Sequence, residues 1–294
     1  MATPLSPAEW YPAGVRDITT RMVSLATGIR VRIAESGPSD GKPLIMIHGW
    51  GGSLYMFRHG LSMLPRHGVR AIAVDLRGYG LSDRPQGPGA YSLDAYLADL
   101  DALLDELELP RVTLLAQSMG GGLSLHYALR KPERLAGIAL INPSNLVAIP
   151  WVWLMTLTPR RIAEALGKRL VPRWLVAFIL RHIAYARGEM VSERDVDEYW
   201  APTQLPRFVD AIRGAIADFD WRPLTPRQSS SLAVPSVVIL GTEDRLFKGA
   251  HVAAERLAGA RVVRLPGGHC VHEESPGVVY EIVSDFLTEA GSSK

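Results

Sequence analysis

An apolar run that stops at a serine constrains this chain more than any other feature. Residues 112–115 read Val-Thr-Leu-Leu, and the chain continues as Ala-Gln-Ser-Met-Gly-Gly-Gly. A strand that turns into a helix at a serine needs small residues two positions before and after it, because the two backbones must approach closely. Ala116 and Gly120 occupy these positions around Ser118. The pattern therefore predicts a strand, a tight turn and a helix, with the serine hydroxyl projecting above a sheet.

This turn resembles a nucleophile elbow, whose usual pattern is Gly-x-Ser-x-Gly. Ala116 departs from that pattern by one methyl group, the smallest addition that the turn has to accommodate. A glycine-rich helix start without any catalytic role would show the same residues. The two interpretations differ in whether the rest of the chain supplies partners for a reactive serine.

Such partners can be proposed at the ends of other apolar runs. A serine hydroxyl is a weak nucleophile, so it needs a base, an orienting acid and an oxyanion hole. One run leads into His-Gly-Trp-Gly-Gly, a second ends in adjacent acids, and a third ends in a histidine. The three segments are Pro43–Gly52, Val237–Asp244 and Val262–His269.

The chain order serine, aspartate, histidine is that of the α/β-hydrolases and differs from the orders in chymotrypsin-like and subtilisin-like enzymes. Two further segments are similar to motifs of that superfamily. Residues 75–83 resemble its Asp-x-Arg-Gly-x-Gly-x-Ser loop, and Gly268-His269 with Glu274 and Pro276 resembles its Gly-His-x-x-x-x-Glu-x-Pro segment. The chain therefore resembles the α/β-hydrolase superfamily over residues 20–287.

The resemblance implies a catalytic triad. Ser118 is the expected nucleophile, and its presence argues against the epoxide and haloalkane chemistry of relatives that carry Asp or Glu at this place. Asp244 matches the acid position and is preferred over the adjacent Glu243. His269 is the expected general base, whereas His272 is expected in the turn beneath it.

The resemblance also assigns an oxyanion hole. The backbone N–H of Met119 is one expected donor, because the residue after the nucleophile begins a helix. Trp50 is the expected second donor, with Gly51 as the alternative. His48 resembles the histidine that braces this loop. Asp75 is expected to be structural, either accepting backbone N–H bonds or pairing with an arginine of its own loop.

Alternating apolar strands and helical patterns predict a mostly parallel central sheet covered by helices on both faces. The resemblance implies that this sheet has the α/β-hydrolase fold. Ligands gather at the carboxyl ends of the strands of such sheets, where the expected site residues lie. The alternation breaks after residue 144. We therefore expect a core of residues 1–144 and 223–294 and an inserted helical cap of residues 145–222.

Apolar residues at the start of the expected cap suggest a substrate pocket, lined by Trp151, Trp153 and Met155. Residues 174–180 form a second apolar stretch between arginines. This stretch is interpreted either as a cap helix packed on the core with a solvated basic face, or as an acyl pocket or membrane-surface contact.

Composition and motifs limit the ligands and partners that are expected for this chain. A formal net charge of +2 gives no argument for nucleic-acid binding, and neither a metal-ligand spacing nor a nucleotide fingerprint is present, so no cofactor is expected. Residues 136–159 lack charge, but prolines and asparagines interrupt them, which argues against a membrane span. A single cysteine and an N-terminus without a signal-peptide pattern predict a cytoplasmic protein. No pattern indicates an oligomeric state.

The favoured function is a cofactor-free serine hydrolase that cleaves a carboxylic ester of an apolar or aromatic small molecule through an acyl-enzyme. A carbon–carbon bond hydrolase of the meta-cleavage type or a perhydrolase uses the same triad. Meta-cleavage hydrolases usually have Gly-Asn-Ser-Met-Gly-Gly and a tryptophan after the catalytic histidine, where this chain has Ala116-Gln117 and Cys270. A non-catalytic ligand-binding protein is the alternative of another class.

Overall fold

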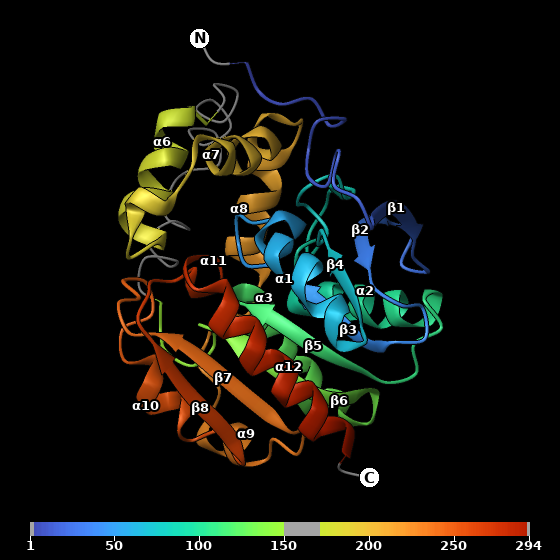
Figure 1. Cartoon of the computed structure of the whole chain (residues 1–294), viewed down its shortest axis with the longest axis vertical. Helices are drawn as coiled ribbons and strands as arrows, with labels where there is room; N and C mark the ends of the chain where they lie inside the picture. The colour runs from blue at the N-terminus through green and yellow to red at the C-terminus, as the bar shows by residue number, and fades with distance from the viewer. Residues whose placement is uncertain (1–2, 150–170, 293–294) are drawn as a thin grey trace.

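A computed structural model describes residues 3–149 and 171–292, and its centre is an eight-stranded sheet (Figure 1). The strand order is β1-β2-β4-β3-β5-β6-β7-β8. The first two strands run antiparallel to their neighbours and the other pairs are parallel, which confirms the predicted sheet. The strands are β1 (Ile18–Ser24), β2 (Arg30–Ser36), β3 (Lys42–Ile47), β4 (Val69–Val74), β5 (Val112–Gln117), β6 (Leu135–Ile141), β7 (Ser236–Gly241) and β8 (Ala260–Leu265).

Helices cover both faces of this sheet. In Figure 1, α1 and α12 lie on one face, and α2 and α3 lie on the other. The α-helices are α1 (Arg58–Met63), α2 (Leu93–Glu106), α3 (Met119–Arg130), α6 (Arg173–Ile179), α7 (Glu193–Trp200), α8 (Phe208–Asp218), α9 (Pro226–Ser230), α10 (Ala250–Ala254), α11 (Val271–Glu274) and α12 (Pro276–Ser292). Shorter turns of 3₁₀- or π-helix are η1 (Leu54–Phe57), η2 (Leu64–His67), η3 (Pro132–Arg134), η4 (Leu180–Ala184), η5 (Gly188–Met190) and η6 (Ala201–Gln204).

Alternation along the strands divides the core into two layers. Successive side chains of a strand point to opposite faces. In β3, Ile45 and Ile47 join the cluster that packs against α2 and α3, whereas Leu44 and Met46 join the cluster beneath α1 and α12. All four are completely buried, so this strand is apolar without interruption. Such a strand must be covered on both sides, which is why helices flank the sheet twice.

The helices α6, α7 and α8 lie between β6 and β7 in the chain and beyond the carboxyl ends of the parallel strands (Figure 1). Helix α7 starts at a capping box in which Ser192 and Asp195 bond each other's backbone N–H groups. Helix α6 buries Val176 but leaves Trp174 and Phe178 exposed. Its exposed surface is therefore partly apolar, in addition to the arginines that flank it.

Residues 54–67 do not form one continuous helix, because η1, α1 and η2 follow one another there. Pro65 is the second residue of η2, where its missing backbone donor is tolerated.

The N-terminal segment contacts the rest of the chain through residues 10 and 11. Trp10 is buried at 4% exposure, and the backbone N–H of Tyr11 donates to Glu198 of α7.

No helix within the described residues is long and apolar enough to cross a membrane.

Candidate active site

Ser118 lies at the junction between β5 and α3. Its backbone has φ 52° and ψ −116°, a left-handed conformation that is costly for a residue with a side chain. The Ser118 carbonyl accepts from the N–H groups of Gly122 and Ser144, and the Ser118 N–H donates to Ile141 of β6. The strained turn is therefore fixed by backbone bonds on both sides, while the serine side chain makes no capping bond within the described residues.

Two glycines allow the chain to come close to this serine. A Cβ atom at Gly120 would lie 2.7 Å from the carbonyl oxygen of His48, and one at Gly49 would lie 2.8 Å from the Ser118 Cβ. Either side chain would force these segments apart. The small residues that the sequence places around Ser118 thus bring the His48–Gly52 loop directly against it, and the Ala116 methyl group is completely buried without disturbing the turn.

The base and the acid expected from the sequence are in contact. The Nδ1–H of His269 donates to Asp244 at 2.8 Å, and both side chains are less than a tenth exposed. Asp244 also accepts from the N–H groups of Leu246 and Phe247. Burial by itself raises the pKa of Asp244. His269 and these N–H groups lower the pKa by more than burial raises it, so the pKa lies below its usual value. Glu243 is exposed on the other side of the turn.

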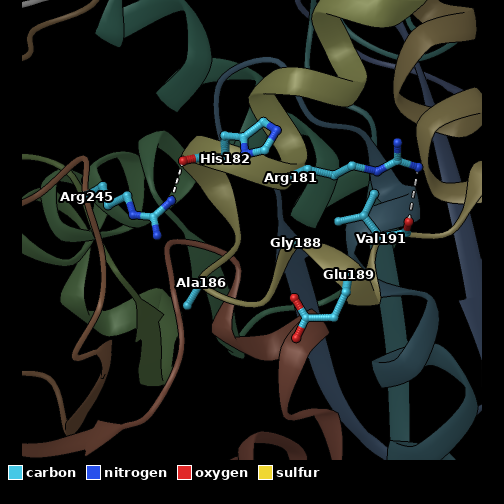
Figure 2. A pocket seen from close by; sticks show the side chains of 7 residues that line it. All are labelled: Arg181, His182, Ala186, Gly188, Glu189, Val191 and Arg245. Atoms are coloured by element: carbon cyan, nitrogen blue, oxygen red, sulfur yellow. Dashed lines mark hydrogen bonds between the residues drawn. The ribbon is translucent and has the colours of Figure 1, made fainter.

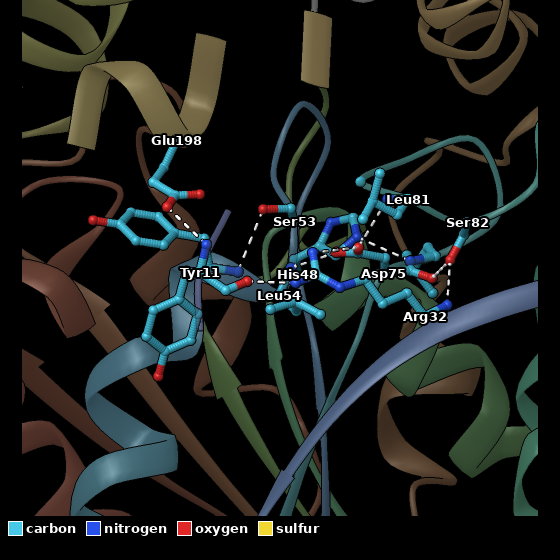
Figure 3. A network of polar contacts seen from close by, with 12 residues as sticks. Tyr11, Arg32, His48, Ser53, Leu54, Asp75, Leu81, Ser82 and Glu198 are labelled. Carbon is cyan, nitrogen blue, oxygen red and sulfur yellow. Dashed lines mark hydrogen bonds and ion pairs between the residues drawn. The ribbon is translucent and has the colours of Figure 1, made fainter. Parts of the chain in front are cut away.

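The loop that carries the expected oxyanion donor Trp50 is held by His48 (Figure 3). Its Nδ1–H donates to the Gly49 carbonyl at 2.8 Å, and its Nε2 accepts from the N–H of Leu76 at 3.0 Å. This arrangement requires a neutral imidazole, and burial lowers the pKa of His48 accordingly. The loop is also tied to α8, because the indole N–H of Trp50 donates to the carbonyl of Ile212.

Asp75 is structural, as expected, but its charged partner is not the one suggested by its own loop. It is completely buried and accepts from the N–H groups of Leu54 and Leu81 (Figure 3). Arg32 of β2 lies 3.7 Å away and is its ion-pair partner, whereas Arg77 binds Asp99 instead. Pairing β2 with β4 brings Arg32 to the end of β4, which spacing along the chain could not indicate.

The two expected oxyanion donors belong to helix α3 and to the loop that contains Gly49. Met119 is the first residue of α3, so its N–H has no partner in the helix ladder. Trp50 lies in the loop that Gly49 packs against Ser118, and Gly51 follows it with φ 78°. The expected pocket residues Trp151, Trp153 and Met155 lie outside the described residues.

The sequence did not reveal which residues hold the histidine loop, residues 266–270 between β8 and α11. Asn142, at the end of β6, donates from Nδ2 to the carbonyls of Gly268 and His269 at 3.1 and 3.0 Å, and its Oδ1 accepts from the N–H of Gly241. Gln117 donates to the same His269 carbonyl. Both residues follow or end apolar runs in the sequence, but nothing in the sequence indicates which remote backbone groups they bind. Asn142 thus joins the acid-bearing strand to the base-bearing loop.

An Asn142→Asp variant is expected to lower kcat by about 10²-fold, because the new carboxylate faces two carbonyl oxygens and displaces His269. Asn145→Asp is the matched control, since Asn145 also has positive φ and also donates to two carbonyls, those of Asp220 and Arg222. It should lower stability but leave kcat within a few-fold. Steady-state kinetics on a chromogenic ester, together with melting temperatures, test this; equal kcat in both variants would contradict it.

His272 lies apart from the reacting groups. It is completely buried against Phe57, and neither ring nitrogen has a partner among the described residues. Burial, reinforced by Arg58, lowers the pKa of His272 well below its usual value. The imidazole is therefore neutral in the folded protein.

The neutral histidines predict a loss of stability in acid. Unfolded His48 and His272 bind a proton near pH 6.5, whereas their folded pKa values are lower, so the free energy of unfolding falls as the pH drops below 6.5. His272, whose folded pKa lies well below its usual value, should contribute about 1 kcal/mol between pH 7 and 5.5, and His48 acts in the same direction. Chemical denaturation at both pH values measures the loss, and a His272→Leu variant should lose about 1 kcal/mol less than the parent. An unchanged pH slope in that variant would contradict this account.

Two cavities adjoin the loop that follows β7 and carries Asp244. One of about 490 Å³ is lined by residues of η4 and η5 and by Arg245, which donates to the carbonyl of His182 (Figure 2). Another of about 530 Å³ is lined by Asp244 and Phe247, whose ring packs edge-on against the His269 imidazole. Within residues 3–149 and 171–292, no group of three or more metal-binding side chains occurs.

Known proteins share sequence similarity and the same fold with this chain. A family model described as alpha/beta hydrolase fold matches residues 42–276. The 2-hydroxy-6-oxo-2,4-heptadienoate hydrolase of Pseudomonas putida is 27% identical over 91% of this chain and 95% of its own length. Epoxide hydrolase 2 of Caenorhabditis elegans is 26% identical over 89% of this chain and 78% of its own length. The crystal structure of the enol-lactonase from Burkholderia xenovorans LB400 superposes with a TM-score of 0.74, at 24% identity, over 91% of this chain and all of that one.

Proposed function

The chain belongs to the alpha/beta hydrolase family, and from this premise we propose that it is a serine hydrolase that cleaves a carboxylic ester of an apolar acyl or aromatic small molecule. The observation that carries the proposal is the hydrogen bond between His269 and Asp244, on loops that meet the strained Ser118 turn. The three side-chain types needed for acyl transfer thus occur beyond the carboxyl ends of β5, β7 and β8, which belong to the parallel part of one sheet.

The proposed reaction proceeds through an acyl-enzyme. The Ser118 hydroxyl attacks the ester carbonyl and transfers its proton to Nε2 of His269, while Asp244 holds the imidazole through Nδ1 and stabilises its cation. The backbone N–H groups of Met119 and Trp50 receive the negative carbonyl oxygen. The carbon–oxygen bond to the leaving alcohol then breaks, and His269 returns the proton to the alcohol. A water molecule repeats these steps on the acyl group and releases the acid.

Ser118 distinguishes the proposed ester hydrolysis from the epoxide hydrolysis named for one relative. Epoxide hydrolases of this family attack with an aspartate, whereas this chain has Ser118 at that place. Enol-lactones are themselves carboxylic esters, so the enol-lactonase neighbour accords with ester cleavage. Carbon–carbon bond hydrolysis is the second candidate, favoured by the 27% identity to the 2-hydroxy-6-oxo-2,4-heptadienoate hydrolase.

We also propose that residues 145–222 act as a cap over a core of residues 1–144 and 223–294. The two ends of this insertion meet, because Leu224 N–H donates to the carbonyl of Asn145 and the Asn145 side chain binds the carbonyls of Asp220 and Arg222. Because the insertion enters and leaves the core at one place, its residues can differ in substrate contacts without altering the order of the strands. The proposed pocket residues Trp151, Trp153 and Met155 belong to this insertion.

Labelling with a fluorophosphonate probe tests the nucleophile, with mass spectrometry to locate the adduct. The proposal expects a single adduct on Ser118, and a non-catalytic binding protein should remain unlabelled. Hydrolysis of p-nitrophenyl esters of increasing acyl length then tests the substrate class. Specificity should rise gradually with length, because each buried methylene contributes about 0.8 kcal/mol. Labelling of Ser118 combined with turnover of a vinylogous 1,5-diketone but of no ester would favour the carbon–carbon hydrolase.

A further inference from the structure

Glu274 forms a buried bridge beneath the histidine loop. Its side chain is completely inaccessible to solvent. One carboxylate oxygen, Oε1, accepts from the N–H of Gly268 at 2.6 Å. The other, Oε2, accepts from the N–H groups of Ala186 and Arg187 at 3.1 and 3.0 Å. Each oxygen thus binds a different segment: the loop that carries His269, and the segment through which the chain leaves η4.

We propose that Glu274 is a positioning residue, which places His269 for catalysis by joining its loop to the inserted residues 184–187. This inference rests on the proposed function and goes beyond it, because Glu274 contacts neither Ser118 nor Asp244 in the interactions described above. Its effect passes through the backbone of Gly268, the residue immediately before the base.

A carboxylate suits this position because it only accepts hydrogen bonds. Both of its oxygens can take backbone donors, and bonds to an ionised acceptor are about twice as strong as neutral ones. A glutamine has one accepting oxygen and one donating amide group. The glutamine oxygen can accept from Gly268 or from Ala186 and Arg187. Its NH₂ group then faces the backbone N–H groups of the other segment, and two donors cannot form a hydrogen bond.

Other bonds keep the same two segments together. The N–H of Cys270 donates to the carbonyl of Ala184, and Arg187 donates to the carbonyl of Glu274 and to the Ser275 hydroxyl. Ala186 also lines the 490 Å³ cavity beside Arg245 (Figure 2). Ala186 in the wall of that cavity and Gly268 in the loop that carries His269 therefore donate to the same buried carboxylate. We expect a displacement of either segment to move the other.

The neighbouring Glu273 provides a matched control. Its side chain is equally inaccessible, but it binds Arg58 and the hydroxyl of Tyr199, which lie on α1 and α7. The Glu273 side chain bonds the Cys270 thiol, but none of its described bonds joins it to the backbone of Gly268 or His269. Two adjacent buried carboxylates thus differ in whether they hold the backbone of the general base.

The test compares Glu274→Gln, Glu274→Asp, Glu273→Gln and Arg187→Met, each normalised by active-site titration. The Glu274 variants are expected to lower kcat by about 10²-fold with a smaller change in KM, because a displacement of the base near 1 Å costs that much. Asp at 274 retains the charge but is too short to reach both segments. Arg187→Met keeps the backbone donor and should stay within about 3-fold.

A second readout needs no substrate. The proton shared by His269 Nδ1 and Asp244 should give a low-field ¹H NMR resonance in the parent chain, which broadens or disappears in the Glu274 variants and persists in Glu273→Gln. Parental kcat and resonance in either folded Glu274 variant, or equal losses in Glu273→Gln, would overturn the proposal. An unlabelled parent would refute the serine hydrolase while leaving the resonance as the test of positioning.

Discussion

A Ser118→Ala variant is expected to hydrolyse esters ~10⁴-fold or more slowly than the parent and to unfold at nearly the same temperature. The hydroxyl forms the covalent bond to the acyl group in the proposed reaction, so its removal leaves only binding and the oxyanion donors. It makes no capping bond in the folded chain, and alanine carries the same backbone strain at φ 52°. Burst and steady-state rates on a p-nitrophenyl ester, with thermal unfolding, measure both expectations.

Ser124→Ala is the control for this experiment. Ser124 lies in the same helix, is completely buried, and donates to the Gly120 carbonyl at 2.9 Å. Its loss should cost about 1 kcal/mol of stability and leave kcat within about 2-fold. Near-parental turnover by folded Ser118→Ala protein would remove the serine-hydrolase proposal, whatever the control does.

The fold was predictable because its central strands are apolar on both faces. A run such as residues 44–47, completely buried in the structure, can exist only in a sheet covered twice, and alternation with helical patterns then requires parallel crossovers. The contact between His269 and Asp244 was predictable for the same reason. Carboxyl ends of parallel strands meet at one edge, so residues far apart in sequence converge there.

The partners that hold these groups were not predictable. Asn142 binds the carbonyls of residues 268 and 269, and Glu274 binds the N–H groups of Ala186 and Arg187. Backbone groups of remote segments carry no sequence signature, because every residue offers them. The ion pair of Asp75 with Arg32 depends likewise on the register between β2 and β4.

The N-terminal residues show a related limit. Trp10 is buried and its indole N–H donates to the carbonyl of Leu5, although the segment has no periodic pattern. Arg194 of α7 donates to the carbonyl of Glu9, so the burial of this segment depends on a helix of the insertion. A single large apolar side chain in a segment without periodicity does not reveal which remote surface covers it.

Replacing His269 by alanine is expected to lower kcat by ~10⁴-fold or more, whereas His272→Ala should retain most of the parental kcat. The two histidines lie close together in the sequence, where the motif around Gly268 favours His269, and their surroundings in the structure differ. His269 donates to Asp244, so its other ring nitrogen can take the serine proton. His272 is completely buried against Phe57 and has no hydrogen-bond partner among the described residues.

The cost of losing His272 should appear in stability instead. Truncating a buried ring leaves a cavity, which we expect to lower the free energy of unfolding by about 2 kcal/mol or more. Rates normalised by fluorophosphonate titration separate this loss from any loss of chemistry. Added imidazole should partly restore turnover by His269→Ala and should not affect His272→Ala, because a soluble base replaces a missing proton acceptor but not missing packing. The reverse ranking of the two variants, or rescue of His272→Ala alone, would show that the base has been assigned to the wrong histidine.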